Sequence, residues 1–93
     1  MIYLFTYELH PSFPRNIEPL HAELENSLAW CHYMDRTWLI ATDEDVGQLN
    51  RRISRHLRQS DMWLVVQITL EYDGWLPEEA WDWIQKTAAQ MGI

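Results

Sequence analysis

The sequence predicts an α+β fold, in which one β-sheet carries packed helices, and three observations indicate it. The chain has 93 residues, which is the length of a single domain. Short runs rich in β-branched and aromatic residues alternate with segments whose apolar residues recur at helical spacing. The order of these segments is strand, helix, strand, strand, helix, strand and a final helix.

The first strand and the first helix are expected in the N-terminal third of the chain. Residues 2–9 (IYLFTYEL) are almost continuously apolar, as in a central strand that is buried on both faces. Two prolines in residues 10–16 indicate a loop. Asn16 can cap a helix that runs to about residue 28. Its apolar residues form one stripe: Ile17, Leu20, Leu24 and Leu28.

A β-hairpin is predicted next, because the two short β-rich runs AWCHYM and TWLIAT flank residues 35–36. If Met34 pairs with Thr37, regular alternation places Cys31 opposite Ile40. The other face of the hairpin then carries Trp30, His32 and Leu39.

The second half of the chain predicts a helix, a strand and a last helix. Thr42 can cap the second helix, which runs through the apolar stripe Val46, Leu49, Ile53 and Leu57. Residues 62–70 (MWLVVQITL) read as the fourth strand, and residues 73–74 (Asp-Gly) as a turn. Pro77 opens the third helix, which ends before Gly92.

The first six elements give the βαββαβ order of a ferredoxin-like sandwich, followed by an extra C-terminal helix, in one domain of residues 1–93. Right-handed crossovers place the first two helices on one face of the sheet. The first and fourth strands are apolar on both sides, so the opposite face also needs cover. The third helix or a second copy of the chain can supply it.

Composition limits the partners that we expect. The net charge is −7 with a pI near 4.8, which disfavours nonspecific binding to nucleic acid and to anionic membranes. No apolar run has the roughly 18 residues of a membrane span, and the N-terminus lacks the features of a signal peptide. Cys31 is the only cysteine, which excludes an internal disulfide. We therefore expect a cytoplasmic protein with no membrane contact.

Glu8 is the leading candidate for a functional side chain, because an acid that ends a central strand indicates a metal ion, a partner or solvent there. Mg²⁺ prefers one or two carboxylates plus water, so two copies of Glu8 could hold one. His10 follows closely and could assist a proton transfer. The alternative for Glu8 is a solvated strand end.

The basic residues are clustered, since four of the seven lie in one stretch: Arg51, Arg52, Arg55 and Arg58. At about 100° per residue, Arg51, Arg55 and Arg58 form a stripe opposite the apolar stripe of the second helix, and Arg52 lies to the side. Such a stripe can contact phosphates. The alternative is a solvated helix face whose charge suits the C-terminal end of the helix dipole.

Six tryptophans are many for a chain of this length, and some of them are expected in an interface. Trp75, Trp81 and Trp83 are the candidates for a dimer contact. Trp81 and Trp83 lie about 200° apart on a helix, so both cannot point inward. The alternative is that these side chains shield the sheet of their own chain.

Three stretches resemble a group of small bacterial proteins related to the CRISPR-associated small nuclease and adaptor family, whose shape VapD-type toxin ribonucleases share. These stretches are Tyr7-Glu8, the tryptophan-rich hairpin of residues 30–43 and the segment GWLPEEAWDWI of residues 74–84. The resemblance implies a homodimer that packs through open sheet faces. It also implies a divalent metal held by Glu8, where the family usually has aspartate, together with Glu8 of the dimer mate.

Two functions follow from these observations. The first is a binding or assembly module that acts as a homodimer, needs no cofactor and binds nucleic acid weakly or not at all. The second is an endonuclease, acting on RNA or DNA, that depends on Mg²⁺ or Mn²⁺ at Glu8. A nuclease needs a basic track beside Glu8, so the position of the arginines distinguishes the two functions.

Overall fold

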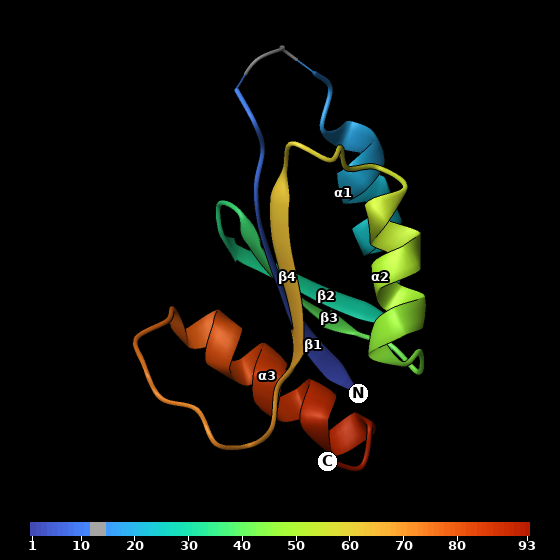
Figure 1. Ribbon diagram of the computed structural model, residues 1–93. Coiled ribbons are helices and arrows are strands. Elements are labelled where there is room, and N and C mark those ends of the chain that lie inside the picture. Colours follow the sequence, from blue (N-terminus) through green and yellow to red (C-terminus); the bar gives the residue numbers. More distant parts are fainter. Residues whose placement is uncertain (12–14) are drawn as a thin grey trace.

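The computed structural model describes residues 1–11 and 15–93, which form a four-stranded antiparallel sheet and three helices (Figure 1). The elements follow the chain as β1 (Ile2–Glu8), α1 (Glu18–Glu25), β2 (Ala29–Met34), β3 (Thr37–Ala41), α2 (Val46–Ser54), β4 (Met62–Gln67) and α3 (Glu78–Gln90). The strand order in the sheet is β2-β3-β1-β4. This is the predicted ferredoxin-like topology with an added C-terminal helix.

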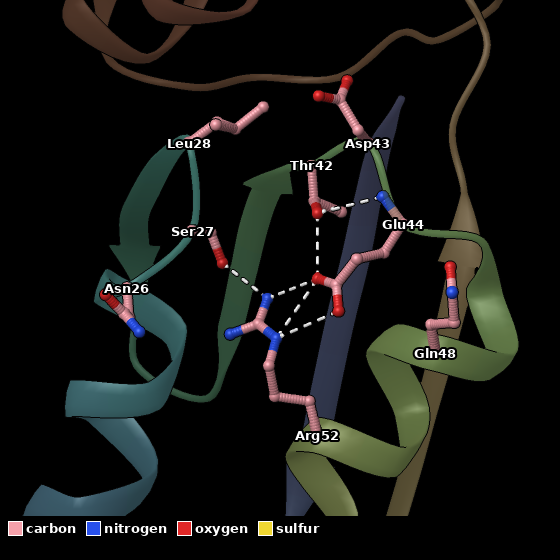
Figure 2. Close-up of a pocket in the computed structure, with 8 residues that line it drawn as sticks. All are labelled: Asn26, Ser27, Leu28, Thr42, Asp43, Glu44, Gln48 and Arg52. Atoms are coloured by element: carbon pink, nitrogen blue, oxygen red, sulfur yellow. Dashed lines mark hydrogen bonds and ion pairs between the residues drawn. The ribbon is translucent and has the colours of Figure 1, made fainter.

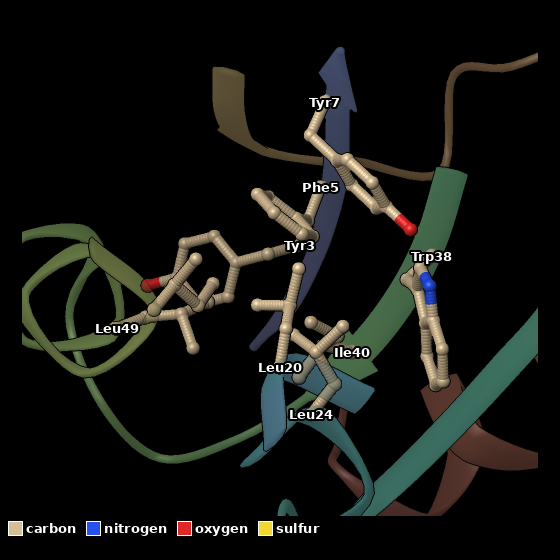
Figure 3. Packing of buried hydrophobic residues seen from close by; sticks show 9 residues of the cluster. Tyr3, Phe5, Tyr7, Leu20, Leu24, Trp38, Ile40 and Leu49 are labelled. Carbon is tan, nitrogen blue, oxygen red and sulfur yellow. The ribbon is translucent and has the colours of Figure 1, made fainter. Parts of the chain in front are cut away.

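The main core lies between one face of the sheet and helices α1 and α2 (Figure 3). Alternate residues of a strand point to the same face, so β1 directs its odd-numbered side chains into this core. The buried members of the core are Tyr3, Phe5, Tyr7, Leu20, Leu24, Trp38, Ile40, Leu49 and Ile53. The two middle strands of the sheet, β1 and β3, supply most of the aromatic surface.

Helix α3 lies on the opposite face of the sheet and covers only one end of it (Figure 1). Ala88 of α3 packs against Ile2 and Ala41, at the start of β1 and the end of β3. Trp83 packs against the same cluster. The outward side chains of β4 receive no such cover, and three of them are exposed.

The hairpin has a different register from the regular one expected. Met34 does pair with Thr37, but Cys31 then lies opposite Leu39 rather than Ile40, because the ladder shifts between Cys31 and Met34. A bulge of this kind inserts an extra residue into one strand. It therefore moves each β2 residue that precedes the bulge to the face opposite the one that regular alternation predicts.

The consequence of the bulge is a cluster of stacked aromatic rings on the face that α1 and α2 cover. His32 stacks on Trp38 with ring centroids 4.0 Å apart, and Trp30 lies 5.4 Å from the same ring. Leu39 and Cys31 instead share the face that carries α3. The expectation that Trp30, His32 and Leu39 share one face was therefore wrong for Leu39.

One helix cap, the end of one helix and the end of one strand also differ from the expectation. Asp45, not Thr42, caps α2, because its carboxylate accepts from the Gln48 backbone while the Gln48 side chain accepts from the Asp45 backbone. Helix α1 ends at Glu25, which leaves Leu28 outside the stripe and 68% exposed. The strand predicted over residues 62–70 ends at Gln67. The loop expected at residues 10–16 lies partly outside the described residues.

Candidate interaction face

One face of the sheet is apolar and only partly covered. Its side chains come from the even-numbered residues of two neighbouring strands, which the ladder places side by side. We call this surface the open face and define it as Leu4, Thr6, Met62, Leu64 and Val66. Met62 is 66% exposed, Leu64 58% and Val66 43%.

The open face arises from the composition of β4, which is apolar on both sides. Trp63 and Val65 pack against the core beneath α1 and α2, and the Trp63 indole N–H donates to Asn50 Oδ1 at 2.8 Å. Met62, Leu64 and Val66 alternate with them and point the other way. Exposed alternate leucine, valine and methionine side chains on one strand mark a surface that gains free energy when covered.

An apolar groove of about 460 Å³ adjoins the open face. It lies between the sheet, α3 and the segment of residues 68–77 that connects β4 to α3, and Leu4 belongs to both surfaces. Tyr72 stacks on Trp81 along its wall, with ring centroids 5.8 Å apart. Trp75 also lines the groove yet is 85% exposed, so the apolar surface continues beyond the strands.

The three candidate tryptophans have different environments. Trp75 is the exposed one, whereas Trp81 and Trp83 are both half-buried on opposite flanks of α3. The 200° separation therefore leaves each ring partly inward, with Ile84 buried between them. Only Trp75 offers a large free surface to a partner.

Glu8 lies on the same side of the sheet as the open face, opposite Met62, and it is exposed. A shallow hollow of about 280 Å³ beside it is lined by Thr6 and Leu64 among others. Within residues 1–11 and 15–93, no three histidine, cysteine, aspartate or glutamate side chains gather as a metal site. A metal at Glu8 therefore needs ligands from a second copy or from a substrate.

His10 is exposed, and its backbone N–H donates to Asp61 Oδ1 at 2.8 Å. This contact directs the chain after β1 toward the turn that precedes β4. It involves the backbone of His10 and assigns no chemistry to the imidazole.

Hydrogen bonds within the chain hold the Arg52 guanidinium in place (Figure 2). Its guanidinium donates to Glu44 Oε1 at 2.8 Å, to Ser27 Oγ at 2.9 Å and to the Glu23 carbonyl at 2.7 Å. It thereby joins α1, α2 and the loop after β3. The same hydrogen bond from Arg52 holds the pKa of the Glu44 carboxyl below its usual value.

The arginine stripe that the sequence predicted does not extend along the helix to Arg58. Helix α2 ends at Ser54, so Arg58 lies beyond it. Arg55 pairs with Glu23 Oε1 at 3.3 Å, and His56 contacts the same oxygen at 3.1 Å. Burial raises the pKa of Glu23, but the bonds from His56 and Arg52 outweigh it and the net shift is downward.

Arg51, Arg52 and Arg55 belong to the layer of α1 and α2, across the sheet from the open face (Figure 1). Arg51 is exposed on α2. Glu8 points to the opposite side of the sheet, because even-numbered residues of β1 face away from the helix-covered core. The arginines of α2 therefore form no basic track beside Glu8.

Asp61 is the residue that sequence reasoning missed. Its side chain is fully buried and accepts from the Arg15 guanidinium, from the His10 N–H and from the Arg58 N–H at 2.7 Å. The Arg15 bond is the largest of the causes that hold the pKa of Asp61 far below its usual value. The only sequence signal was that Asp61 directly precedes an apolar strand, and an acid at such a position is expected to be a solvated loop residue.

Cys31 is buried on the α3 side of the sheet. Burial raises the pKa of its thiol to about 11, so the reactive thiolate is scarce at neutral pH. This agrees with an inert core cysteine.

The chain matches none of the protein-family models, curated proteins or solved structures with which it was compared. The resemblance to CRISPR-associated and VapD-type proteins therefore stays a prediction. In the described part of the chain, no helix is long and apolar enough to pass through a lipid bilayer.

Proposed function

We propose that this protein is a binding module that assembles as a homodimer through β4, whose exposed side chains form part of the open face. The observation that carries the proposal is the alternation of Met62, Leu64 and Val66, which leaves three large apolar side chains exposed on a regular strand. Covering each of them contributes about 1–2 kcal/mol to association. Within residues 1–11 and 15–93, no part of the fold covers them.

The area required for a stable dimer supports a broader contact than β4 alone. A specific interface buries roughly 800 Å² on each partner, which three side chains cannot supply. The exposed residues Leu70, Tyr72 and Trp75 follow β4 directly, and Trp75 extends the apolar surface beside the groove. Tryptophan and tyrosine are the residues that most often anchor such contacts.

The charge distribution favours a protein partner over nucleic acid. The open face holds no basic residue, and Glu8 at its border is negative. The arginines of α2 lie in the layer on the other side of the sheet, where Glu23 contacts Arg52 and Arg55 and Glu44 contacts Arg52.

The test is to place a charge on the open face. Leu64→Glu should give a folded monomer, because a carboxylate at the centre of the contact would be desolvated on association. Light scattering at micromolar concentration should give about twice 11.2 kDa for the unchanged chain and a single chain mass for the variant.

Leu28→Glu is the matched control, since Leu28 is 68% exposed but belongs to no strand of the open face. It should leave the dimer intact. A monomeric unchanged chain, or a Leu64→Glu variant that still dimerises fully, would contradict the proposal.

The second candidate is a metal-dependent endonuclease, and the exposure of Glu8 on the dimer-forming side of the sheet is the observation that favours it. Two copies could bring two carboxylates to one Mg²⁺ or Mn²⁺. The position of the α2 arginines, across the sheet from Glu8, makes this candidate the weaker one. The test is cleavage of RNA or DNA with Mg²⁺ or Mn²⁺ that disappears in Glu8→Gln.

A further inference from the structure

The outer edge of β4 carries unpaired backbone groups. The Ile68 N–H donates to the Ile2 carbonyl at 2.9 Å, while the Tyr7 N–H donates to the Arg36 carbonyl beyond β3. Bonding alternates along an antiparallel pair, so even-numbered residues of β4 bond to β1. The N–H and C=O groups of Trp63, Val65 and Gln67 therefore point outward. Within the described residues they have no backbone partner.

The two edges of the sheet differ in how well they are protected. Folded proteins protect sheet edges with charged residues, proline, bulges or a covering element. Edge strand β2 has a bulge between Cys31 and Met34. Edge strand β4 (MWLVVQ) has a regular ladder with no charge and no proline, and Figure 1 shows no helix or strand in front of it.

We propose that the β4 edge pairs with β4 of a second copy, antiparallel about a two-fold axis at Val65. This rests on the proposed homodimer and specifies its geometry: the two copies meet along β4, so their open faces lie side by side, and Leu64 contacts Val66 of the partner subunit across the axis. Val65 then faces Val65 of the partner subunit. Trp63 faces Gln67 of the partner subunit, and the two-fold axis repeats this pair on the other side of Val65. Each of these pairs exchanges two backbone hydrogen bonds. The two sheets become one continuous sheet.

The side chains of β4 suit this self-pairing. On the open face, Leu64 comes opposite Val66 of the partner subunit, in the closely spaced kind of pair where apolar side chains touch. The strand has no charged residue, so no like charges meet across the axis. The two open faces join into one apolar surface along the new strand pair.

This geometry keeps the two Glu8 side chains apart. Glu8 lies opposite Met62, three residues from the axis at Val65. At roughly 3.3 Å per residue, the two Glu8 residues are about 20 Å apart along the strands. They cannot share one metal ion, so an edge-paired dimer supports the binding function and opposes the two-carboxylate nuclease.

Val65→Pro tests the pairing, because the Val65 N–H points outward and proline removes it without loss of a bond to β1. Proline is tolerated at strand edges for the same reason. Val65→Ala is the matched control, since it shortens the side chain and keeps the N–H. In sedimentation analysis, Val65→Pro should raise the dimer dissociation constant about 10- to 100-fold relative to Val65→Ala.

Hydrogen exchange of the unchanged chain provides a second measurement that needs no variant. The amides of Trp63, Val65 and Gln67 should exchange quickly in dilute monomer and slowly at concentrations where the dimer forms. A dimer with unslowed exchange at these amides, or with equal dissociation constants for both Val65 variants, would overturn the edge pairing but leave the homodimer standing. A chain that stays monomeric would overturn both proposals.

Discussion

At the scale of single residues, Asp61 has the largest effect on stability that we expect for one side chain. It ties together three separate parts of the chain, the residues after β1, the segment before α1 and the turn before β4, through His10, Arg15 and Arg58. Each contact is a hydrogen bond to the ionised Asp61 carboxylate, and such charge-assisted bonds are stronger than bonds between neutral groups. The turn is closed further by the Asp61 N–H, which donates to the Arg58 carbonyl at 3.0 Å.

Asp61→Asn should lower the free energy of unfolding by about 3 kcal/mol, because it leaves the Arg15 guanidinium, 13% exposed, without its counterion. Urea unfolding at neutral pH measures this. Asp82→Asn is the control, since Asp82 is an exposed carboxylate of α3, and it should change stability by about 0.5 kcal/mol or less. Equal stabilities of the two variants would refute the role of Asp61.

The Asp61–Arg15 pair also makes the free energy of unfolding depend on pH. The Arg15 bond lowers the pKa of Asp61 in the folded chain, whereas the unfolded chain keeps a value near 3.9. Below about pH 4 the unfolded chain therefore binds more protons, and the free energy of unfolding falls as the pH drops. Above about pH 5 the contribution is complete. Urea midpoints between pH 3 and 7 should show a smaller acid loss in Asp61→Asn than in the unchanged chain.

At the scale of elements, α2 shows how a short helix is held at its start. Asp45 and Gln48 form a capping box, with Asp45 Oδ1 2.8 Å from the Gln48 nitrogen and Gln48 Oε1 3.0 Å from the Asp45 nitrogen. Each bond satisfies a backbone donor that the helix itself cannot use. Arg52 then fixes the helix to α1 through Glu23 and Ser27.

Asp45→Ala should lower the free energy of unfolding by about 1 kcal/mol, the usual effect of losing a cap. Asp43→Ala is the control, because Asp43 is exposed and lies two residues before the cap. Thermal unfolding followed by circular dichroism measures both. A larger loss in Asp43→Ala than in Asp45→Ala would contradict the assignment of the cap.

At the scale of the whole molecule, the net charge is strongly negative and three of the seven basic side chains are paired with carboxylates. The net charge is −7, and Arg15, Arg52 and Arg55 each contact a carboxylate. A protein that neutralises few phosphates binds nucleic acid weakly, and more weakly still as salt rises. The acidic field and the position of the arginines thus oppose a nucleic-acid substrate.

We therefore expect no nanomolar binding of RNA or DNA in about 150 mM salt, measured by fluorescence anisotropy, and no cleavage with Mg²⁺ or Mn²⁺. Glu8→Gln keeps the size of the side chain and removes its charge, so it should behave like the unchanged chain in both assays. Metal-dependent cleavage that disappears in Glu8→Gln would instead establish the nuclease.

The sequence by itself determined the element order and the fold class, because both follow from local patterns. The apolar stripe that places Leu20 and Leu24 in the core, the period-two runs and Pro77 at the start of α3 each act within a few residues. Glu8 at the end of β1 was visible for the same reason.

Only the tertiary structure decided which surfaces and side chains are covered, because that depends on contacts between residues far apart in the chain. Nothing in β4 shows that α3 stops short of Leu64, and the hairpin sequence does not show the bulge that places Cys31 opposite Leu39. Arg52 and Asp61 looked like solvated charges until the fold brought their partners to them. Burial removes such groups from water, and a partner from elsewhere in the chain must then replace the lost hydration.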